Sequence, residues 1–274
     1  MPRKNYTPTD LVYQRWIKEG RGKGRGRLYK PWLTVRDVPS RGRSHRIFGF
    51  KSQRTHHLLS DLELAVFFIL EWHQQTQEIR EQFPLQRDST LEIAHSAGIK
   101  HPSIAATQQY MSTDFLVNTL KSDFPKFAVQ VKRSEDLSNT RTIEKLEIER
   151  QYWKQKNTPW FLFTEREIPA TALRNIEWLY PSQSEDIPHD ELTLQLNFYS
   201  SYLQDNPTIT LIDISKKIDI AYSHRPGEAL KELRQLFAKR FIVFDIRKDF
   251  RELTKCDLSF SSIETLEAIN ASSK

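Results

Sequence analysis

Several features common in other classes of protein are missing from this sequence. Cys256 is the single cysteine among 274 residues, so an intramolecular disulfide and a cysteine zinc cluster are both excluded. No run of about 18 apolar residues occurs, so we expect no membrane-spanning helix. The amino terminus is basic but lacks the apolar core of a secretory signal, and we expect a cytoplasmic protein. A Walker A motif is also absent, which leaves ATP and NAD binding without support.

What the chain does contain is enough material for one or two domains with full cores, including 16 Phe, 9 Tyr and 6 Trp. Its charge is unevenly distributed. Residues 1–50 carry 13 Lys and Arg against 3 Asp and Glu, whereas the remaining residues carry 28 against 32. A basic head (+10) on a mildly acidic body (−4) indicates a polyanionic partner, of which nucleic acid is the commonest.

The basic head contains a stretch, GRGKGRGR at 20–27, in which Gly alternates with Arg or Lys. Such a stretch is expected to be flexible and able to follow a phosphate backbone. We therefore predict nonspecific DNA contacts from the basic residues Arg21, Lys23, Arg25, Arg27, Arg41, Arg43 and Arg46. The alternatives are a solvated tail or a protein-docking arm. The neighbouring aromatic side chains are expected to pack rather than to stack on bases: Trp16, Tyr29, Trp32 and Phe48.

Helical and strand-like patterns alternate along the first two thirds of the chain. Helices are predicted at 7–19, 60–74, 89–98 and 140–157, and strands at 45–50, 78–85, 111–117, 127–132 and 158–164. Ser60 and Glu63 form a capping-box pattern at the start of the second helix, and Gly98 is expected to end the third. Because helices and strands are interleaved, we expect an α/β fold whose mixed sheet has helices on its faces.

A second, mostly helical domain is predicted beyond residue 190. The segment PSQSEDIPHD (181–190) has two prolines and no periodicity, which is typical of a linker between domains at 1–180 and 191–274. The second domain is predicted to contain helices at 191–204, 208–220 and 227–240, then short strands at 241–246 and 256–262. Three helices and a two-stranded wing are typical of winged-helix domains. Its basic residues are balanced by acids, so we expect it to dock proteins rather than DNA.

Four polar residues stand out in the first domain. Asp114 lies in the strand-like run MSTDFLV, Gln130 and Lys132 lie in FAVQVK, and Glu63 lies upstream. Strand side chains alternate faces, so Gln130 and Lys132 emerge on one side while the apolar residues between them face the other. An acid that faces an amide and a lysine on the neighbouring strand can hold a divalent metal and a phosphate together. That combination is suited to metal-assisted phosphodiester hydrolysis.

These residues resemble the PD-(D/E)-x-K active site of restriction-enzyme-like nucleases, with Gln130 in place of the usual second acid. More narrowly, the chain is similar to the TnsA family, the endonuclease subunits of heteromeric bacterial transposases. The segments that carry this similarity are HHLLSDLELAVF (56–67), REQFPL (80–85), STDFLV (112–117), QVK (130–132) and TPWFLFT (158–164). It covers most of residues 10–180, in motif order and spacing as well as residue type, and thins past about residue 185. A restriction-endonuclease-like fold is therefore implied for the first domain.

The resemblance implies a Mg²⁺-dependent DNA endonuclease in which Mn²⁺ can substitute. It implies cleavage of the 5′ strand at each transposon end, while an integrase-type transposase subunit cuts and joins the 3′ ends. That subunit and an ATP-dependent transposition regulator are the implied partners, expected at the C-terminal domain. The implied roles are metal binding by Asp114, Gln130 and the backbone carbonyl of Val131, completion of the site by Glu63, and orientation of water by Lys132.

Three of the four polar residues also have a simpler interpretation. Glu63 can serve the capping box alone, and Asp114 can form a turn at a strand end. Lys132 can be a solubility residue on an exposed strand edge. Gln130 is a weaker metal ligand than a carboxylate, although its neutral amide lowers the repulsion between the two acids.

Two other groups of polar residues are expected to lie outside the site. His56 and His57 are adjacent in sequence and point in different directions, so we expect packing at the helix entry or phosphate contact rather than a metal site. The acids of the helix at 140–157 are expected on a solvated face with i,i+4 ion pairs: Glu144, Glu147 and Glu149.

Two further functions are compatible with the sequence. A stand-alone restriction or repair nuclease of the same fold would cleave DNA without partners. A non-catalytic winged-helix DNA-binding protein would bind DNA without metal and would tolerate substitution of Asp114.

Overall fold

A computed structural model describes residues 9–37 and 42–261. The chain divides into two compact units, Met1–Ile168 and Pro169–Lys274. Within the described ranges, no helix is both long enough and apolar enough to cross a membrane.

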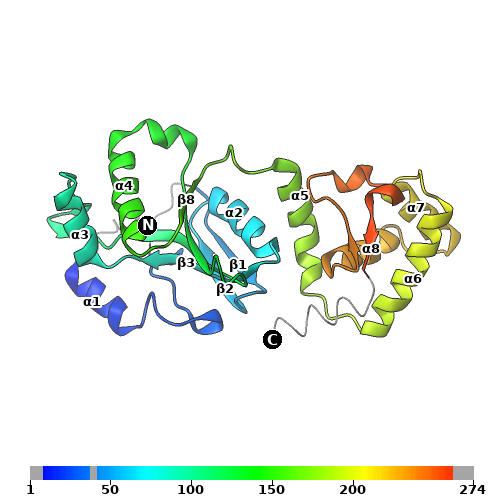
Figure 1. The fold of residues 1–274 in the computed structure, drawn as a ribbon. Coiled ribbons are helices and arrows are strands. Elements are labelled where there is room, and N and C mark those ends of the chain that lie inside the picture. Colours follow the sequence, from blue (N-terminus) through cyan, green and yellow to red (C-terminus); the bar gives the residue numbers. More distant parts are fainter. Residues whose placement is uncertain (1–8, 38–41, 262–274) are drawn as a thin grey trace, which may run out of the picture. The chain divides into compact units, whose positions relative to one another are not determined.

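The first unit is built on a four-stranded mixed sheet with the strand order β3-β6-β7-β8. Neighbouring strands are antiparallel except for β7 and β8, which run parallel. In chain order the main elements are α1 (Asp10–Lys18), β1 (His45–Gly49), β2 (Arg54–Leu58), α2 (Asp61–Trp72), β3 (Thr76–Pro84), α3 (Arg87–Ser96), β4 (Ser103–Ile104), β5 (Thr107–Gln108), β6 (Ser112–Thr119), β7 (Lys126–Val131), α4 (Thr140–Gln155) and β8 (Trp160–Phe163). The predicted helices, strands and mixed sheet of this unit are confirmed (Figure 1).

Both faces of the two central strands, β6 and β7, are buried over most of their length. Leu116 of β6 and Ala128 of β7 are register partners and pack against α3 and α4 in one core cluster. Strand alternation turns Val117 and Val129 toward the opposite face, where they are fully buried as well. Because solvent is excluded on both sides, polar side chains in the middle of these strands must find partners within the protein.

Local sequence signals set the ends of the helices that frame the site. The Ser60 side chain caps α2 by accepting from the backbone N–H of Glu63. Asn139 caps α4 in the same way, accepting from the backbone N–H groups of Arg141 and Thr142. Gly98 follows α3 with φ +64°, the left-handed conformation that commonly ends a helix.

The glycine-rich basic stretch differs from expectation, because it forms a defined loop rather than an extended flexible segment. Its backbone is tied by hydrogen bonds from Gly22 to Lys30 and from Lys30 to Lys23. A Cβ at Gly22 would lie 2.2 Å from the Pro84 ring of β3, and one at Gly24 would lie 2.4 Å from the carbonyl oxygen of Leu28. Both glycines also have positive φ, so the alternating pattern serves close packing and unusual backbone geometry.

The aromatic residues around this loop pack, as predicted. Trp16, Tyr29 and Trp32 are almost fully buried, and Trp16 and Trp32 meet edge to face at 5.2 Å. Phe48 packs against Phe50 with ring centroids 5.7 Å apart, although 45% of Phe48 is exposed.

The second unit is mostly helical. Its elements are α5 (Ala170–Leu179), a 3-10 helix η3 (Tyr180–Gln183), α6 (His189–Asp205), α7 (Leu211–Ala221), α8 (Glu228–Ala238), β9 (Ile242–Val243) and β10 (Ser259–Phe260). The three predicted helices are present, and β9 and β10 pair antiparallel as the predicted strand pair. The boundary between the units differs from the predicted linker at 181–190. It lies at Ile168/Pro169, because α5 and η3 pack on α8.

Candidate functional site

The site is built where β6 and β7 lie side by side. Asp114 Oδ2 accepts a hydrogen bond of 2.8 Å from the backbone N–H of Val131, and the backbone N–H of Asp114 donates to Gln130 Oε1 at 3.1 Å. Lys132 follows β7, with its Nζ 4.0 Å from Asp114 Oδ2 and 2.9 Å from the carbonyl oxygen of Val131. The structure therefore brings together the acid, amide and lysine that the sequence predicts.

Glu63 joins this group from the first turn of α2. Its Oε1 accepts from the hydroxyl of Ser60 at 3.1 Å, and its Oε2 accepts from the backbone N–H of Leu59 at 2.9 Å. The carboxylate thus reaches the residue before the cap rather than the cap residue's own N–H. Glu63 therefore lies at the start of the helix and is buried beside Asp114, and its active-site role stays a prediction.

Gln82 of β3 is a site residue that sequence analysis missed. Its amide Nε2 donates to Asp114 Oδ1 at 3.1 Å and to Glu63 Oε2 at 3.3 Å, and its Oε1 accepts from the Ser112 hydroxyl at 3.0 Å. The side chain is buried, and its backbone φ of +47° is unusual for a residue other than glycine. A residue in the middle of the strand-like run 78–85 carries no sequence signal for this conformation.

Glu149 of α4 is a second missed residue, and its predicted place on a solvated face is wrong. Only 2% of it is exposed, and its Oε1 accepts from the hydroxyl of Thr113 at 2.7 Å and from the indole N–H of Trp160 at 3.0 Å. The indole N–H of Trp153 donates in turn to the Thr113 hydroxyl at 2.7 Å. Helical spacing from the buried residues of α4 could have signalled this, because Glu149 adjoins Ile148 and lies three and four residues from Leu146, Tyr152 and Trp153.

The buried carboxylates of the site hold their protons more tightly than usual. Burial, with the nearby Asp114 charge, raises the pKa of Glu63 to about 8. Burial also raises the pKa of Asp114, although Lys132 opposes that shift. Burial raises the pKa of Glu149 to about 8 as well. Three buried acids with raised pKa values and one adjacent lysine form a site that favours an added cation.

The donor atoms fit a hard divalent metal. Carboxylate oxygens of Glu63 and Asp114, the amide oxygen of Gln130 and the carbonyl oxygen of Val131 are all ligands that Mg²⁺ accepts. Over the described residues, no group of three or more His, Cys, Asp and Glu side chains is arranged to hold a metal. A metal here would therefore depend on the amide, the carbonyl and water beside the acids, as Mg²⁺ commonly does.

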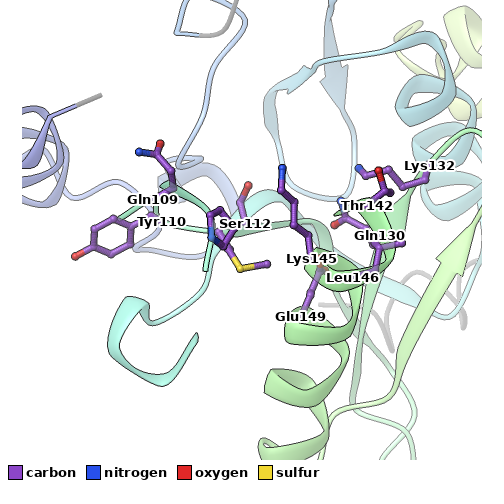
Figure 2. Close-up of a pocket in the computed structure, with 11 residues that line it drawn as sticks. Gln109, Tyr110, Ser112, Gln130, Lys132, Thr142, Lys145, Leu146 and Glu149 are labelled. Atoms are coloured by element: carbon purple, nitrogen blue, oxygen red, sulfur yellow. The ribbon is translucent and has the colours of Figure 1, made fainter. Parts of the chain in front are cut away.

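A pocket of about 380 Å³ opens beside these residues (Figure 2). It is lined by Pro102, Gln109, Tyr110, Met111, Ser112, Gln130, Lys132, Thr142, Lys145, Leu146 and Glu149. Gln130 and Lys132 both line it, which confirms that they emerge on the same side of β7.

The two adjacent histidines lie apart from this pocket. His56 is fully buried, and its Nδ1 is 2.8 Å from Glu81 Oε2, which Arg54 also contacts. The backbone N–H of His57 donates to Glu81 Oε1 at 3.1 Å. Burial lowers the pKa of His57. The prediction that His56 packs rather than binds metal fits this buried ion-pair network.

The predicted DNA-binding residues have different surroundings. Arg21 donates to Asp37 Oδ2 at 2.7 Å and to the Trp32 carbonyl at 3.0 Å, so its charge is balanced within the fold. Lys23, Arg25, Arg27 and Arg46 are exposed. Arg43 is exposed too, at 3.3 Å from Asp61. Arg41 lies outside the described residues. DNA contact by the exposed members stays a prediction.

Comparison with known proteins gives two family matches. The model described as "TnsA-like endonuclease N terminal" matches residues 73–165, and "TnsA endonuclease C terminal" matches residues 167–246. The first match contains Gln82, Asp114, Gln130, Lys132 and Glu149. The chain is also 48% identical over 269 residues to "Transposon Tn7 transposition protein TnsA" from Escherichia coli, and the alignment covers 98% of each chain.

Proposed function

Because the chain belongs to the TnsA endonuclease family, we propose that it is the metal-dependent DNA endonuclease subunit of a transposase. In this proposal it hydrolyses the 5′ strand at each transposon end, and an integrase-type transposase subunit cuts and joins the 3′ ends. An ATP-dependent regulator is the other proposed partner. The second unit is the proposed docking site for these proteins.

The observation that carries the catalytic part is the geometry at Asp114. Its carboxylate lies beside Val131, Gln130 and Lys132 on the neighbouring strand, and Gln82 connects it to Glu63. These are oxygen donors for a divalent ion, next to the ammonium group of Lys132 and an open pocket. That arrangement supports phosphodiester hydrolysis more directly than any other reaction.

The chain's own residues have distinct roles in this proposal. Asp114, Glu63, Gln130 and the Val131 carbonyl would hold Mg²⁺ or Mn²⁺, and a bound ion would supply Lewis-acid stabilisation of the phosphate and a more acidic water. The ammonium of Lys132 can donate to the attacking water or to a phosphate oxygen as charge develops there. Glu149 acts at a distance, by accepting from the Thr113 hydroxyl next to Asp114. Gln82 holds the two carboxylates in one orientation.

A strand-specific cleavage assay tests the proposal. Transposon-end DNA labelled on one strand at a time is incubated with the chain and its transposition partners. We expect cuts on the 5′ strand that require Mg²⁺ or Mn²⁺ and that Asp114→Ala and Lys132→Ala each abolish. Lys154→Ala, on the exposed face of α4, is the control and should cleave normally. Undiminished cleavage by Asp114→Ala would reject this active site, and efficient cleavage without partners would favour a stand-alone nuclease.

A further inference from the structure

The pocket beside the candidate site is lined by a lysine that the proposed chemistry does not use. Lys145 of α4 lines it together with Lys132 and Thr142, while Met111 and Leu146 supply apolar lining. In Figure 2 the amines of Lys132 and Lys145 lie on the same side of the pocket, and the Lys145 amine points away from Glu149. The Lys132 ammonium donates to the Val131 carbonyl and lies near Asp114. Lys145 is therefore the lysine whose ammonium is more available to a ligand in the pocket.

Lys145 has no partner of opposite charge among the residues that the structure describes. Within the part of the chain that the structure describes, its ammonium makes no ion pair and no hydrogen bond. Of the acids near it along α4, Glu144 pairs with Arg141 at 2.5 Å and Glu147 pairs with Arg150 at 2.7 Å. Glu149 accepts from Thr113 and Trp160. Partial desolvation lowers the pKa of Lys145, and the positive charges of Arg141 and Lys132 lower it further. The surroundings of this ammonium therefore favour an added anion.

The size and lining of the pocket suit the phosphate and sugar of a nucleotide. A volume of about 380 Å³ accommodates a group the size of a nucleotide. A lysine is a strong point-charge donor to a phosphate oxygen, and apolar side chains such as Met111 and Leu146 suit the carbon face of a sugar. The pocket also shares Gln130 and Lys132 with the catalytic group, so a strand that places its scissile phosphate at Asp114 continues into or past it.

We propose that this pocket is a second phosphate site, in which Lys145 contacts the phosphodiester next to the scissile one on the strand that is cut. The inference rests on the proposed function, since a DNA strand must lie across Asp114. Lys145 is then a positioning residue that fixes the register of the strand, whereas Lys132 acts at the reacting phosphate.

A binding experiment isolates this contact from cleavage. The full chain with Asp114→Ala, which cannot cut, is titrated at low salt onto a fluorescent duplex that carries a transposon-end sequence. Adding Lys145→Gln should weaken binding about 3- to 10-fold and reduce the slope of log K against log salt by about 1. Lys145→Arg should retain most of the affinity. Lys154→Gln on the same helix should change the affinity less than Lys145→Gln.

A neutral methylphosphonate, placed at one phosphate at a time around the cleavage position, identifies the partner of Lys145. At one position next to the scissile phosphate, the duplex should bind the Lys145→Gln and Lys145 proteins equally well. An equal penalty from Lys145→Gln at every position, no penalty at all, or no DNA binding by the full chain at low salt would overturn the inference. None of these outcomes affects the nuclease proposal, which depends on loss of cleavage by Asp114→Ala in the assembled system.

Discussion

Glu63 and Asp114 accept hydrogen bonds from the same amide nitrogen, Nε2 of Gln82, at 3.3 and 3.1 Å. The two acids come from different elements, α2 and β6, and a third element, β3, joins them. Ser112 fixes the orientation of the amide by donating to its oxygen. The strained backbone of Gln82 therefore supports a shared contact between the two proposed metal ligands.

Gln82→Ala is expected to lower the free energy of unfolding by about 1–3 kcal/mol, because two buried acids lose a common donor. Urea denaturation at neutral pH measures this change. Gln82→Gly is the matched variant: it also lacks the amide but adopts positive φ without strain. It should be more stable than Gln82→Ala, and both should cleave more slowly. Normal stability and cleavage in both variants would contradict the bridging role.

The raised pKa of Glu149 predicts a pH-dependent stability. The folded protein holds this proton up to a pH of about 8, whereas the unfolded chain releases it near the ordinary glutamate pKa. Between those values the folded state binds more protons, so stability falls as the pH rises through this window and levels off above it.

Glu149→Gln should reduce this dependence, because the amide oxygen still accepts from Thr113 and Trp160 but does not titrate. Thermal unfolding measured in EDTA across the window, for both proteins, gives the comparison. Glu63 contributes a slope of the same sign in both, so only the difference between the two curves is used. Identical pH profiles would show that Glu149 is ionised at neutral pH in the folded state.

A divalent metal should stabilise the folded protein through the Asp114 group. At about a hundred times its dissociation constant, Mg²⁺ should add about 2.7 kcal/mol to the free energy of unfolding. Differential scanning calorimetry with added Mg²⁺ or Mn²⁺, and again after EDTA, measures the gain and its reversal. Asp114→Asn keeps the shape of the side chain but should lose most of the stabilisation. An equal gain in that variant would place the metal elsewhere.

The basic residues of the loop at 20–27 should fall into two groups, one that contacts DNA and one that stabilises the fold. Replacing the exposed Lys23, Arg25 and Arg27 by Ser should weaken DNA binding across sequences and flatten its salt dependence, with little effect on stability. Arg21→Ser should instead cost on the order of 1–3 kcal/mol of stability, because it breaks the contact with Asp37. Anisotropy titrations at several salt concentrations and urea denaturation separate the two effects. An unchanged salt slope in the triple variant would contradict the predicted DNA contacts of this loop.

Much of this protein can be predicted from short stretches of its sequence. Ser60 and Gly98 mark helix ends because capping depends on a few neighbouring backbone groups. Gln130 and Lys132 share a pocket because strand side chains alternate with period two. Motif order and spacing indicate the family, which the comparisons confirm. Each of these signals depends either on a few neighbouring residues or on the order and spacing of motifs along the chain.

Contacts between distant segments decided the rest. Glu149 belongs to a charged helix by pattern, and only its packing against Thr113 and Trp160 places it beside the site. By sequence, Gln82 is an ordinary strand residue. Only the structure shows that it has a positive φ and donates to Asp114 and Glu63. The glycine-rich stretch becomes a defined loop because β3 supplies Pro84 as its packing surface. Sequence alone determined the elements and the family of this protein, whereas burial and long-range hydrogen bonding decided which polar residues complete its site.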